Sequence, residues 1–107
     1  MTISQITAQA LAARMATDPD LVLLDVRSAA ERVHASLPGS VHIPAGELAR
    51  RLEELDPDAP TVVICHFGIR SIAAAALLIE RDFDDVCSLI GGIDLYAKEV
   101  ATELARY

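Results

Sequence analysis

Basic residues are scarce in this chain. Its 107 residues include 9 Lys and Arg against 16 Asp and Glu, which gives a formal net charge of -7. Proteins that bind nucleic acids neutralise phosphates with a basic patch, and an acidic composition offers little for such a patch. We therefore expect no nucleic-acid partner.

Cysteine, glycine and proline are also sparse, with two, five and five residues respectively. Two cysteines far apart in sequence do not make the disulfide framework of a small secreted domain. Few glycines and prolines, together with 52% hydrophobic residues, argue against a disordered chain. The sequence has neither a Cys-x-x-Cys nor a His-x-x-x-His spacing, so we expect no zinc site.

Long apolar runs are missing as well. The longest wholly apolar run, residues 72–79, is far shorter than the ~20 residues that cross a bilayer. The first ten residues contain no basic segment and no long apolar stretch, which predicts no secretory signal. We expect one cytoplasmic, reduced domain over residues 1–107 with no membrane partner.

What the chain does contain is a regular alternation of short apolar runs and helix-like segments. The apolar runs predict strands over residues 21–26, 41–43, 61–65 and 86–90. The other segments predict a helix over residues 8–15 capped by Thr7, a short helical turn over 28–34, and helices over 47–55, 72–81 and 94–106. This alternation is typical of an α/β fold whose parallel sheet is covered on both faces. Such sheets bind ligands at the carboxyl ends of their strands.

One strand end carries a candidate nucleophile. Cys65 closes the clearest strand, and a helix begins about five residues later. The helix N-terminus supplies free N–H groups, Gly68 allows the backbone to curl, and Arg70 adds a positive charge. Each feature favours a thiolate, which is the nucleophilic form of cysteine. No Asp or Glu occurs over residues 59–79, so the longest acid-free stretch of the chain surrounds this cysteine.

The motifs together resemble a single-domain rhodanese, a member of the sulfurtransferase family. The match covers nearly the whole chain in the family's order and spacing, and the loop and the Gly-Gly-Ile are its specific part. The motifs are Asp25-Val26-Arg27 with Glu31, the stretch 37–44, the loop Cys65-His66-Phe67-Gly68-Ile69-Arg70-Ser71, and the segment from Val86 through Gly91-Gly92-Ile93 to Tyr96.

This resemblance implies a five-stranded, largely parallel sheet flanked by helices on both faces. It implies that Cys65 takes a sulfane sulfur from a small anionic donor such as thiosulfate. The persulfide then passes the sulfur to a thiol, to cyanide or to a protein acceptor, with no cofactor or metal. The implied anion-binding loop is His66, Phe67, Gly68, Ile69, Arg70 and Ser71, and the implied structural supports are Asp25, Arg27 and Glu31. Arg70 and its neighbours would bind the sulfite half of the donor.

Two other functions stay open on this scaffold. Related phosphatases place five residues between Cys and Arg, whereas four residues separate Cys65 from Arg70, so the loop here is smaller. The loop also contains no acidic residue that could protonate a leaving alcohol. Phosphatase or arsenate reductase activity is therefore the weaker alternative. The other alternative is a binding module or a redox sensor, in which Cys65 is oxidised rather than sulfurated.

Several further residues have two interpretations. Cys87 lies in an apolar run, so we expect a buried small hydrophobe, with a resolving thiol as the alternative. The His66 side chain is either an extra hydrogen-bond donor or a pH-dependent charge beside the thiolate. The alternative is that the side chain is exposed to solvent and only the backbone N–H of His66 contributes to the site. His34 and His42 flank a turn and are expected to be surface histidines. Glu31 lies one helical turn from Arg27, which suggests an ion pair.

Some positions depart from the common family pattern. Ala35-Ser36 replace a usual Gly-His, Arg32 replaces an aromatic residue, and Tyr96 replaces a frequent Trp of the last helix. These positions shape the scaffold and the rim of the site. They therefore bear on the choice of substrate and partner more than on the sulfur chemistry.

Overall fold

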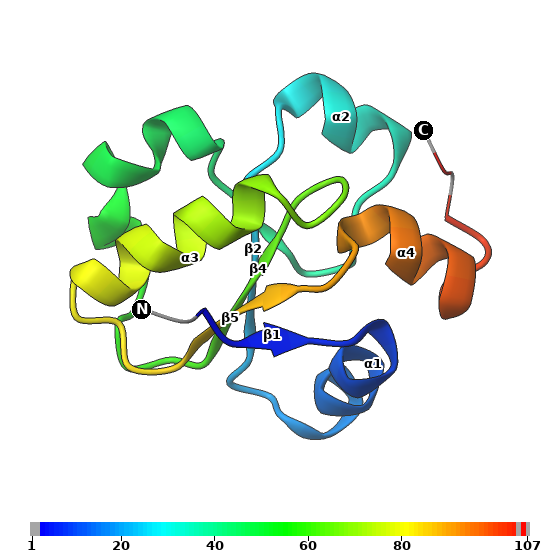
Figure 1. The fold of residues 1–107 in the computed structure, drawn as a ribbon, viewed down its shortest axis with the longest axis horizontal. Helices are drawn as coiled ribbons and strands as arrows, with labels where there is room; N and C mark the ends of the chain where they lie inside the picture. Colours follow the sequence, from blue (N-terminus) through cyan, green and yellow to red (C-terminus); the bar gives the residue numbers. More distant parts are fainter. Residues whose placement is uncertain (1–2, 105, 107) are drawn as a thin grey trace.

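The computed structural model describes residues 3–104 and 106. Five strands form one sheet in the order β1-β5-β4-β2-β3, and every neighbouring pair is parallel (Figure 1). The strands are β1 (Gln5–Ile6), β2 (Val22–Asp25), β3 (Val41–His42), β4 (Thr61–Ile64) and β5 (Val86–Leu89). The helices are α1 (Ala8–Thr17), α2 (Ala29–His34), α3 (Arg70–Glu80), α4 (Gly92–Glu99) and the 3₁₀ helices η1 (Ala45–Arg50) and η2 (Leu52–Glu54). The predicted α/β fold with a parallel sheet is confirmed.

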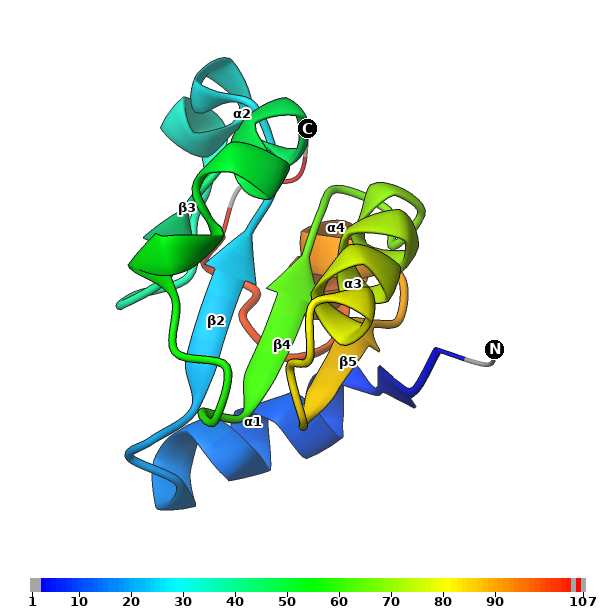
Figure 2. The ribbon, with the colours of Figure 1, turned by 90° about the vertical axis from the view of Figure 1, so that its left-hand side faces the viewer.

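Helices cover both faces of the sheet. In Figure 1, α3 lies on one side of the strands, and α1 and α4 lie on the other. Figure 2 looks onto the α3 side and shows the central strands β2, β4 and β5 running in the same direction. Because both faces are covered, the central strands are apolar along their length, as the short apolar runs predicted.

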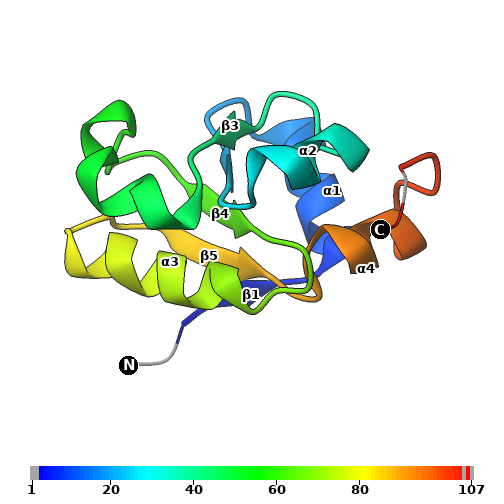
Figure 3. The same ribbon diagram turned by 90° about the horizontal axis from the view of Figure 1, so that it is seen from above.

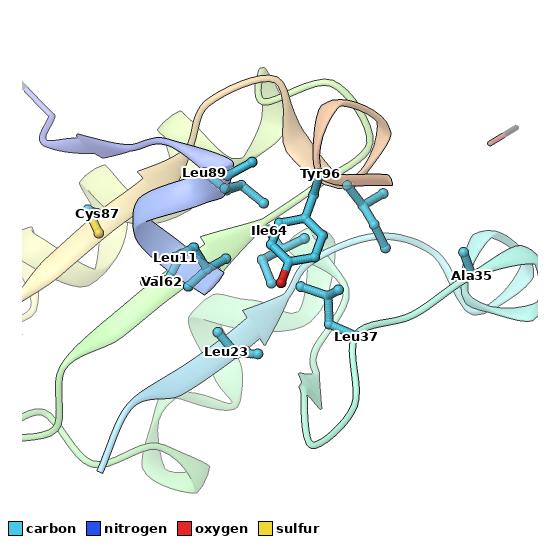
Figure 4. Close-up of a cluster of buried hydrophobic side chains, with 11 residues drawn as sticks. Leu11, Leu23, Ala35, Leu37, Val62, Ile64, Cys87, Leu89 and Tyr96 are labelled. Atoms are coloured by element: carbon cyan, nitrogen blue, oxygen red, sulfur yellow. The ribbon is translucent and has the colours of Figure 1, made fainter. Parts of the chain in front are cut away.

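Side chains of each strand alternate between two buried clusters. Val62 and Ile64 of β4 belong to the cluster under α1 and α4, shown in Figure 4. Val63 and Cys65 belong to the cluster on the α3 side, with Ala75 of that helix. The two-residue period of a strand therefore directs Cys65 toward α3.

Local signals explain where two helices begin. The Thr7 side chain accepts a hydrogen bond from the backbone N–H of Ala10 at 3.1 Å, which confirms the predicted cap of α1. At α2, Ser28 and Glu31 form a reciprocal capping box. Glu31 is thereby held at the start of α2, near the carboxyl end of the sheet.

Two predicted helices were wrong in kind or extent, and one strand was missed. The helix expected over 47–55 is two 3₁₀ helices, because its bonds span three residues, as in Arg51 N–H to Leu48 O. The helix expected over 94–106 begins at Gly92 and ends at Glu99, with residue 105 outside the described residues. Strand β1 was missed because two residues carry no readable period.

The helices are shorter than the thickness of a bilayer's hydrocarbon core. The longest, α3, has 11 residues and spans about 16 Å, against a hydrocarbon core of ~30 Å. Across the described part of the chain, every helix falls short of the length and apolar character that crossing a bilayer requires.

Candidate active site

Cys65 directly follows β4 at the carboxyl edge of the sheet, the edge that Figure 3 shows from above. Its side chain is buried, with 1% of the residue exposed. Its Sγ accepts hydrogen bonds from the backbone N–H groups of Gly68, at 3.1 Å, and Ser71, at 3.3 Å. The Ser71 hydroxyl lies 3.3 Å from the same sulfur. Two backbone N–H groups thus donate to one sulfur atom, and the thiol can itself donate to the Ser71 oxygen. Once the thiol loses its proton, the Ser71 hydroxyl is placed to donate to the sulfur as well, an arrangement that suits a thiolate or another anionic sulfur.

The turn at Gly91-Gly92 packs closely against the backbone of this loop. Gly92 has φ +62, and a Cβ there would lie 2.4 Å from the carbonyl oxygens of Cys65 and His66. Gly68 has φ +89, and a Cβ there would lie 2.9 Å from the Gly91 nitrogen. Both positions combine a left-handed backbone with a close approach, so both require glycine.

The start of α4 holds the loop backbone. The N–H of Ile93 donates to Cys65 O at 2.9 Å, and the N–H of Asp94 donates to His66 O at 3.1 Å. The loop carbonyls thereby satisfy amides at the helix N-terminus that have no partner inside the helix. These two bonds fix the backbone at the start of the loop, ahead of the Gly68 and Ser71 amides that reach the sulfur.

Ser88 is a site residue that sequence reasoning missed. The Ser71 hydroxyl lies 2.6 Å from the Ser88 hydroxyl, and both residues are 0% exposed. Ser88 is the polar residue inside the apolar run that forms β5. A polar side chain at a core-facing strand position was the available signal, because buried hydroxyls need partners.

Arg70, the first residue of α3, points its guanidinium at Glu31. Two hydrogen bonds of 2.7 and 2.8 Å join the guanidinium to the two carboxylate oxygens, and 43% of the Arg70 side chain is exposed. The cysteine loop is therefore acid-free in sequence but not in space. The predicted ion pair between Arg27 and Glu31 is wrong, because no ion pair among the described residues joins them.

Asp25 and Arg27 form a buried ion pair beside the site. The Arg27 Nη2 lies 2.7 Å from Asp25 Oδ2 and donates also to Ala35 O at 2.7 Å. Arg32, on α2, donates to Asp25 Oδ2 at 3.0 Å and to the Ser40 hydroxyl at 3.0 Å. Burial acts to raise the pKa of Asp25, but hydrogen bonds and charges from the two arginines outweigh it and lower the pKa. The network ties the loop after β2 to the segment before β3.

The rim of the site is apolar. Ile69 is 76% exposed and Phe67 is 56% exposed, and the His66 ring stacks on Phe67 with centroids 3.8 Å apart. Ile72 and Ile90 are also exposed, on the first turn of α3 and directly after β5. His66 is half-buried, which leaves both interpretations of its side chain open.

Cys87 lies on the other face of the sheet, in the cluster with Leu11 and Tyr96. Both cysteines are free thiols, and burial raises the pKa of the Cys87 thiol. A resolving role would require Cys87 to cross the sheet. The expectation of a buried small hydrophobe fits this position.

The three histidines are scattered. His34 is exposed on α2, and His42 Nε2 lies 2.7 Å from the Arg27 carbonyl oxygen. Within residues 3–104 and 106, His, Cys, Asp and Glu side chains do not gather in groups of three that could hold a metal ion.

Comparison with known proteins decides the family. A model of the rhodanese-like domain matches residues 7–99. The chain belongs to the rhodanese-like family. A solved rhodanese-related protein from Thermoplasma volcanium is 30% identical, with a TM-score of 0.83 over 91% of this chain and 93% of that one.

Curated members of the rhodanese-like family include named sulfurtransferases. A thiosulfate sulfurtransferase, GlpE, from Pseudomonas fluorescens is 38% identical over 79% of this chain and 78% of its own length. YrkF from Bacillus subtilis, which is named a sulfur carrier protein and not a sulfurtransferase, is 36% identical over 85% of this chain, which covers 49% of that relative. The chain thus spans about half the length of one relative and most of the other. These relatives support a rhodanese-like sulfurtransferase.

Proposed function

We propose that the protein transfers sulfane sulfur from an anionic donor such as thiosulfate through a persulfide on Cys65. One observation carries this proposal: two backbone N–H groups and one hydroxyl converge on a buried Sγ at 3.1 to 3.3 Å. Such a cradle holds a small anionic sulfur species before and after transfer. The sulfurtransferase names of relatives point to the same chemistry.

The reaction has two displacement steps. The Cys65 thiolate attacks the outer sulfur of thiosulfate, an S–S bond forms, and the donor's S–S bond breaks with its electron pair leaving on sulfite. An acceptor thiolate or cyanide then attacks the outer sulfur of the persulfide. The Cys65 thiolate is released, so the loop donors stabilise the leaving group in this second step.

Arg70 has a secondary role in binding the donor. Its guanidinium is bound to Glu31 at 2.7 and 2.8 Å, so an anionic donor competes with a carboxylate for it. The loop amides and the N-terminus of α3 are the primary anion site. Asp25, Arg27 and Glu31 act as structural supports in this proposal, bracing the segments around the loop.

Thiosulfate loading tests the proposal. Incubation with thiosulfate should add one sulfur atom to the intact protein, measured by mass spectrometry. Cys65→Ser should abolish the addition, and Cys87→Ser, which removes the second thiol from the opposite face, should retain it. Sulfur addition that survives Cys65→Ser would refute the assignment. Rapid modification of Cys65 by peroxide, with no loading from several sulfane donors, would favour the redox sensor.

The acceptor is a protein thiol in this proposal, because the exposed rim is apolar. Phe67 and Ile69 stand out from the loop, and Arg70 is neutralised by Glu31. A protein that presents an uncharged or basic face suits this rim and the overall charge of -7. We also propose a reducing, cytoplasmic setting, since the reaction needs a free thiol. We further propose that residues 1–107 form one domain, since their strands form a single sheet.

The rim is tested by comparing a protein acceptor with a small one. Ile69→Ser should slow sulfur transfer to reduced thioredoxin by roughly three- to tenfold, because apolar contact area is lost. Transfer to cyanide should stay unchanged, since cyanide needs no docking surface. The matched control is Val41→Ser, an exposed valine on β3 outside the loop, which should alter neither rate. Equal slowing with both acceptors would contradict a docking role.

A further inference from the structure

We propose that Ser88 is a positioning residue for Cys65: it directs the Ser71 hydroxyl so that the Ser71 proton points at the sulfur. The inference deepens the proposed function, because it concerns the state of the same nucleophile. It rests on geometry and on a count of hydroxyl protons.

The three atoms form a short buried chain. Cys65 Sγ lies 3.3 Å from Ser71 Oγ, and Ser71 Oγ lies 2.6 Å from Ser88 Oγ. The residues are 1%, 0% and 0% exposed, so all three are shielded from bulk solvent. Ser88 sits between Cys87 and Leu89, which face α1 and α4, so Ser88 faces α3 like Cys65.

The two hydroxyls carry one proton each, and only one direction uses both. If Ser88 donates to Ser71, then Ser71 donates to the sulfur and each O–H has an acceptor. If Ser71 donates to Ser88, the Ser88 proton has no acceptor among the described residues, and a buried donor is left without a partner. In the thiol, the Cys65 S–H donates to Ser71 Oγ. In the thiolate, which can only accept, the chain therefore runs from Ser88 to Ser71 to Cys65.

This direction favours an anionic sulfur. A thiolate only accepts hydrogen bonds, and Ser71 adds a hydroxyl to the two backbone donors already on it. The Ser88 bond polarises the Ser71 hydroxyl and strengthens its donation, because hydrogen bonds in a chain reinforce one another. Ser88 thereby acts on Cys65 without touching it.

A buried hydroxyl with a purely structural role is expected to form its hydrogen bond with a nearby backbone oxygen. Thr61, a buried hydroxyl residue on the neighbouring strand β4, bonds to the backbone oxygen of Ala59 two residues away at 3.1 Å. Ser88 forms no such local bond among the described residues and reaches a side chain that contacts the nucleophile. Thr61 is therefore the matched control for loss of a buried strand hydroxyl.

The test is a double-mutant cycle on the pH profile of Cys65 alkylation by iodoacetamide, read by mass spectrometry of the Cys65 peptide. Ser71→Ala should move the profile midpoint up by about one pH unit, and Ser88→Ala by about 0.3 to 0.5 unit. The alkaline plateau should rise slightly, because a thiolate with fewer donors is more nucleophilic. In the Ser71→Ala background, Ser88→Ala should move the midpoint no further. Ser88→Thr keeps the hydroxyl and should restore the wild-type midpoint.

Three results would overturn the inference. They are an unchanged midpoint in folded Ser88→Ala, the same additional shift in the Ser71→Ala background, or an equal shift in the Thr61→Val control. Alkylation needs no sulfur donor, so the cycle stands apart from the proposed function. Failure of thiosulfate to load the wild-type protein would refute sulfur transfer and leave the relation between Ser88 and Cys65 measurable.

Discussion

Cys65 and Cys87 lie on or beside neighbouring parallel strands, and both are buried, yet their surroundings are opposite in kind. The Cys65 sulfur accepts two backbone hydrogen bonds in a loop closed by Arg70 and α3. Cys87 packs among apolar side chains that include Leu11 and Val62 (Figure 4). Burial alone does not distinguish the two thiols. We therefore expect the donors that face each sulfur to decide its reactivity.

Strand geometry separates the two cysteines. The pairing of β4 with β5 places Val62 opposite Cys87, so the side chains of these two residues share one face. Cys65 lies three positions after Val62 and points to the other face. On that face the Ser71 amide, in the first turn of α3, reaches the Cys65 sulfur, because α3 begins there directly after the loop.

The largest effect we expect is in native-state alkylation of the two thiols. Cys65 should react with iodoacetamide at least about 10³-fold faster than Cys87 at neutral pH. Burial raises the pKa of the Cys87 thiol. Both thiols are buried, but Cys65 lies under a short surface loop whose Phe67 and Ile69 are exposed, whereas reaching Cys87 requires opening of a central strand, which costs more free energy. Peptide mass spectrometry over a time course measures both rates.

Denaturant provides the control for that ratio. In the unfolded chain both thiols are exposed, and their rates should agree within about threefold. Comparable native rates for the two cysteines would contradict the contrast drawn between their sites.

The second expected effect concerns the glycine turn that supports only the Cys65 loop. Gly92→Ala should lower thiosulfate loading by roughly 10²-fold, because the new Cβ displaces the carbonyls of Cys65 and His66. Loading rate and thermal unfolding should be measured together. The environment of Cys87, on the opposite face, should keep its slow alkylation as long as the variant folds.

Substitutions at two other glycines serve as controls that distinguish a steric clash from backbone strain. Gly39 has φ +76 with open space around it, so Gly39→Ala should cost stability and leave loading intact. Gly46 has open space and no positive φ, so Gly46→Ala should change neither. Full loading by Gly92→Ala would show that the turn does not shape the cradle.

Sequence reasoning found what is local in the chain. The strand, Cys65, Gly68 and the helix that follows lie within about ten residues, so their spacing predicts the cradle. The Arg70–Glu31 pair joins residues 39 apart, and the Ser71–Ser88 contact joins residues 17 apart. Neither is visible without the fold, because each depends on which strand or helix becomes a neighbour.

Helix ends were the other weak point, for a physical reason. The segment over 94–106 has a helical pattern, but α4 ends at Glu99, where Val100 and Ala101 both donate to the Tyr96 carbonyl. Such an end depends on the packing of Tyr96 and Leu104 against the cluster under α1. Tertiary contacts of this kind override the local preference for helix.

The smallest expected effect is on stability in alkaline solution, and it isolates Cys87. Burial raises the pKa of this thiol above the ordinary value of 9.0, so the folded state stays protonated while the unfolded chain ionises. Its contribution is complete below pH 9.0 and is lost as the pH rises toward the folded-state pKa, by at most ~1.4 kcal/mol per pH unit. Cys87→Ala removes this loss, so its free energy of unfolding should approach that of the wild type between pH 9 and 10, measured by urea titration. Tyr96, whose pKa burial also raises, is present in both proteins and cancels in the difference. If the free energies of unfolding of the two proteins changed in parallel with pH, Cys87 would be as hydrated in the folded state as in the unfolded chain. The apolar surroundings that distinguish Cys87 from Cys65 would then be contradicted.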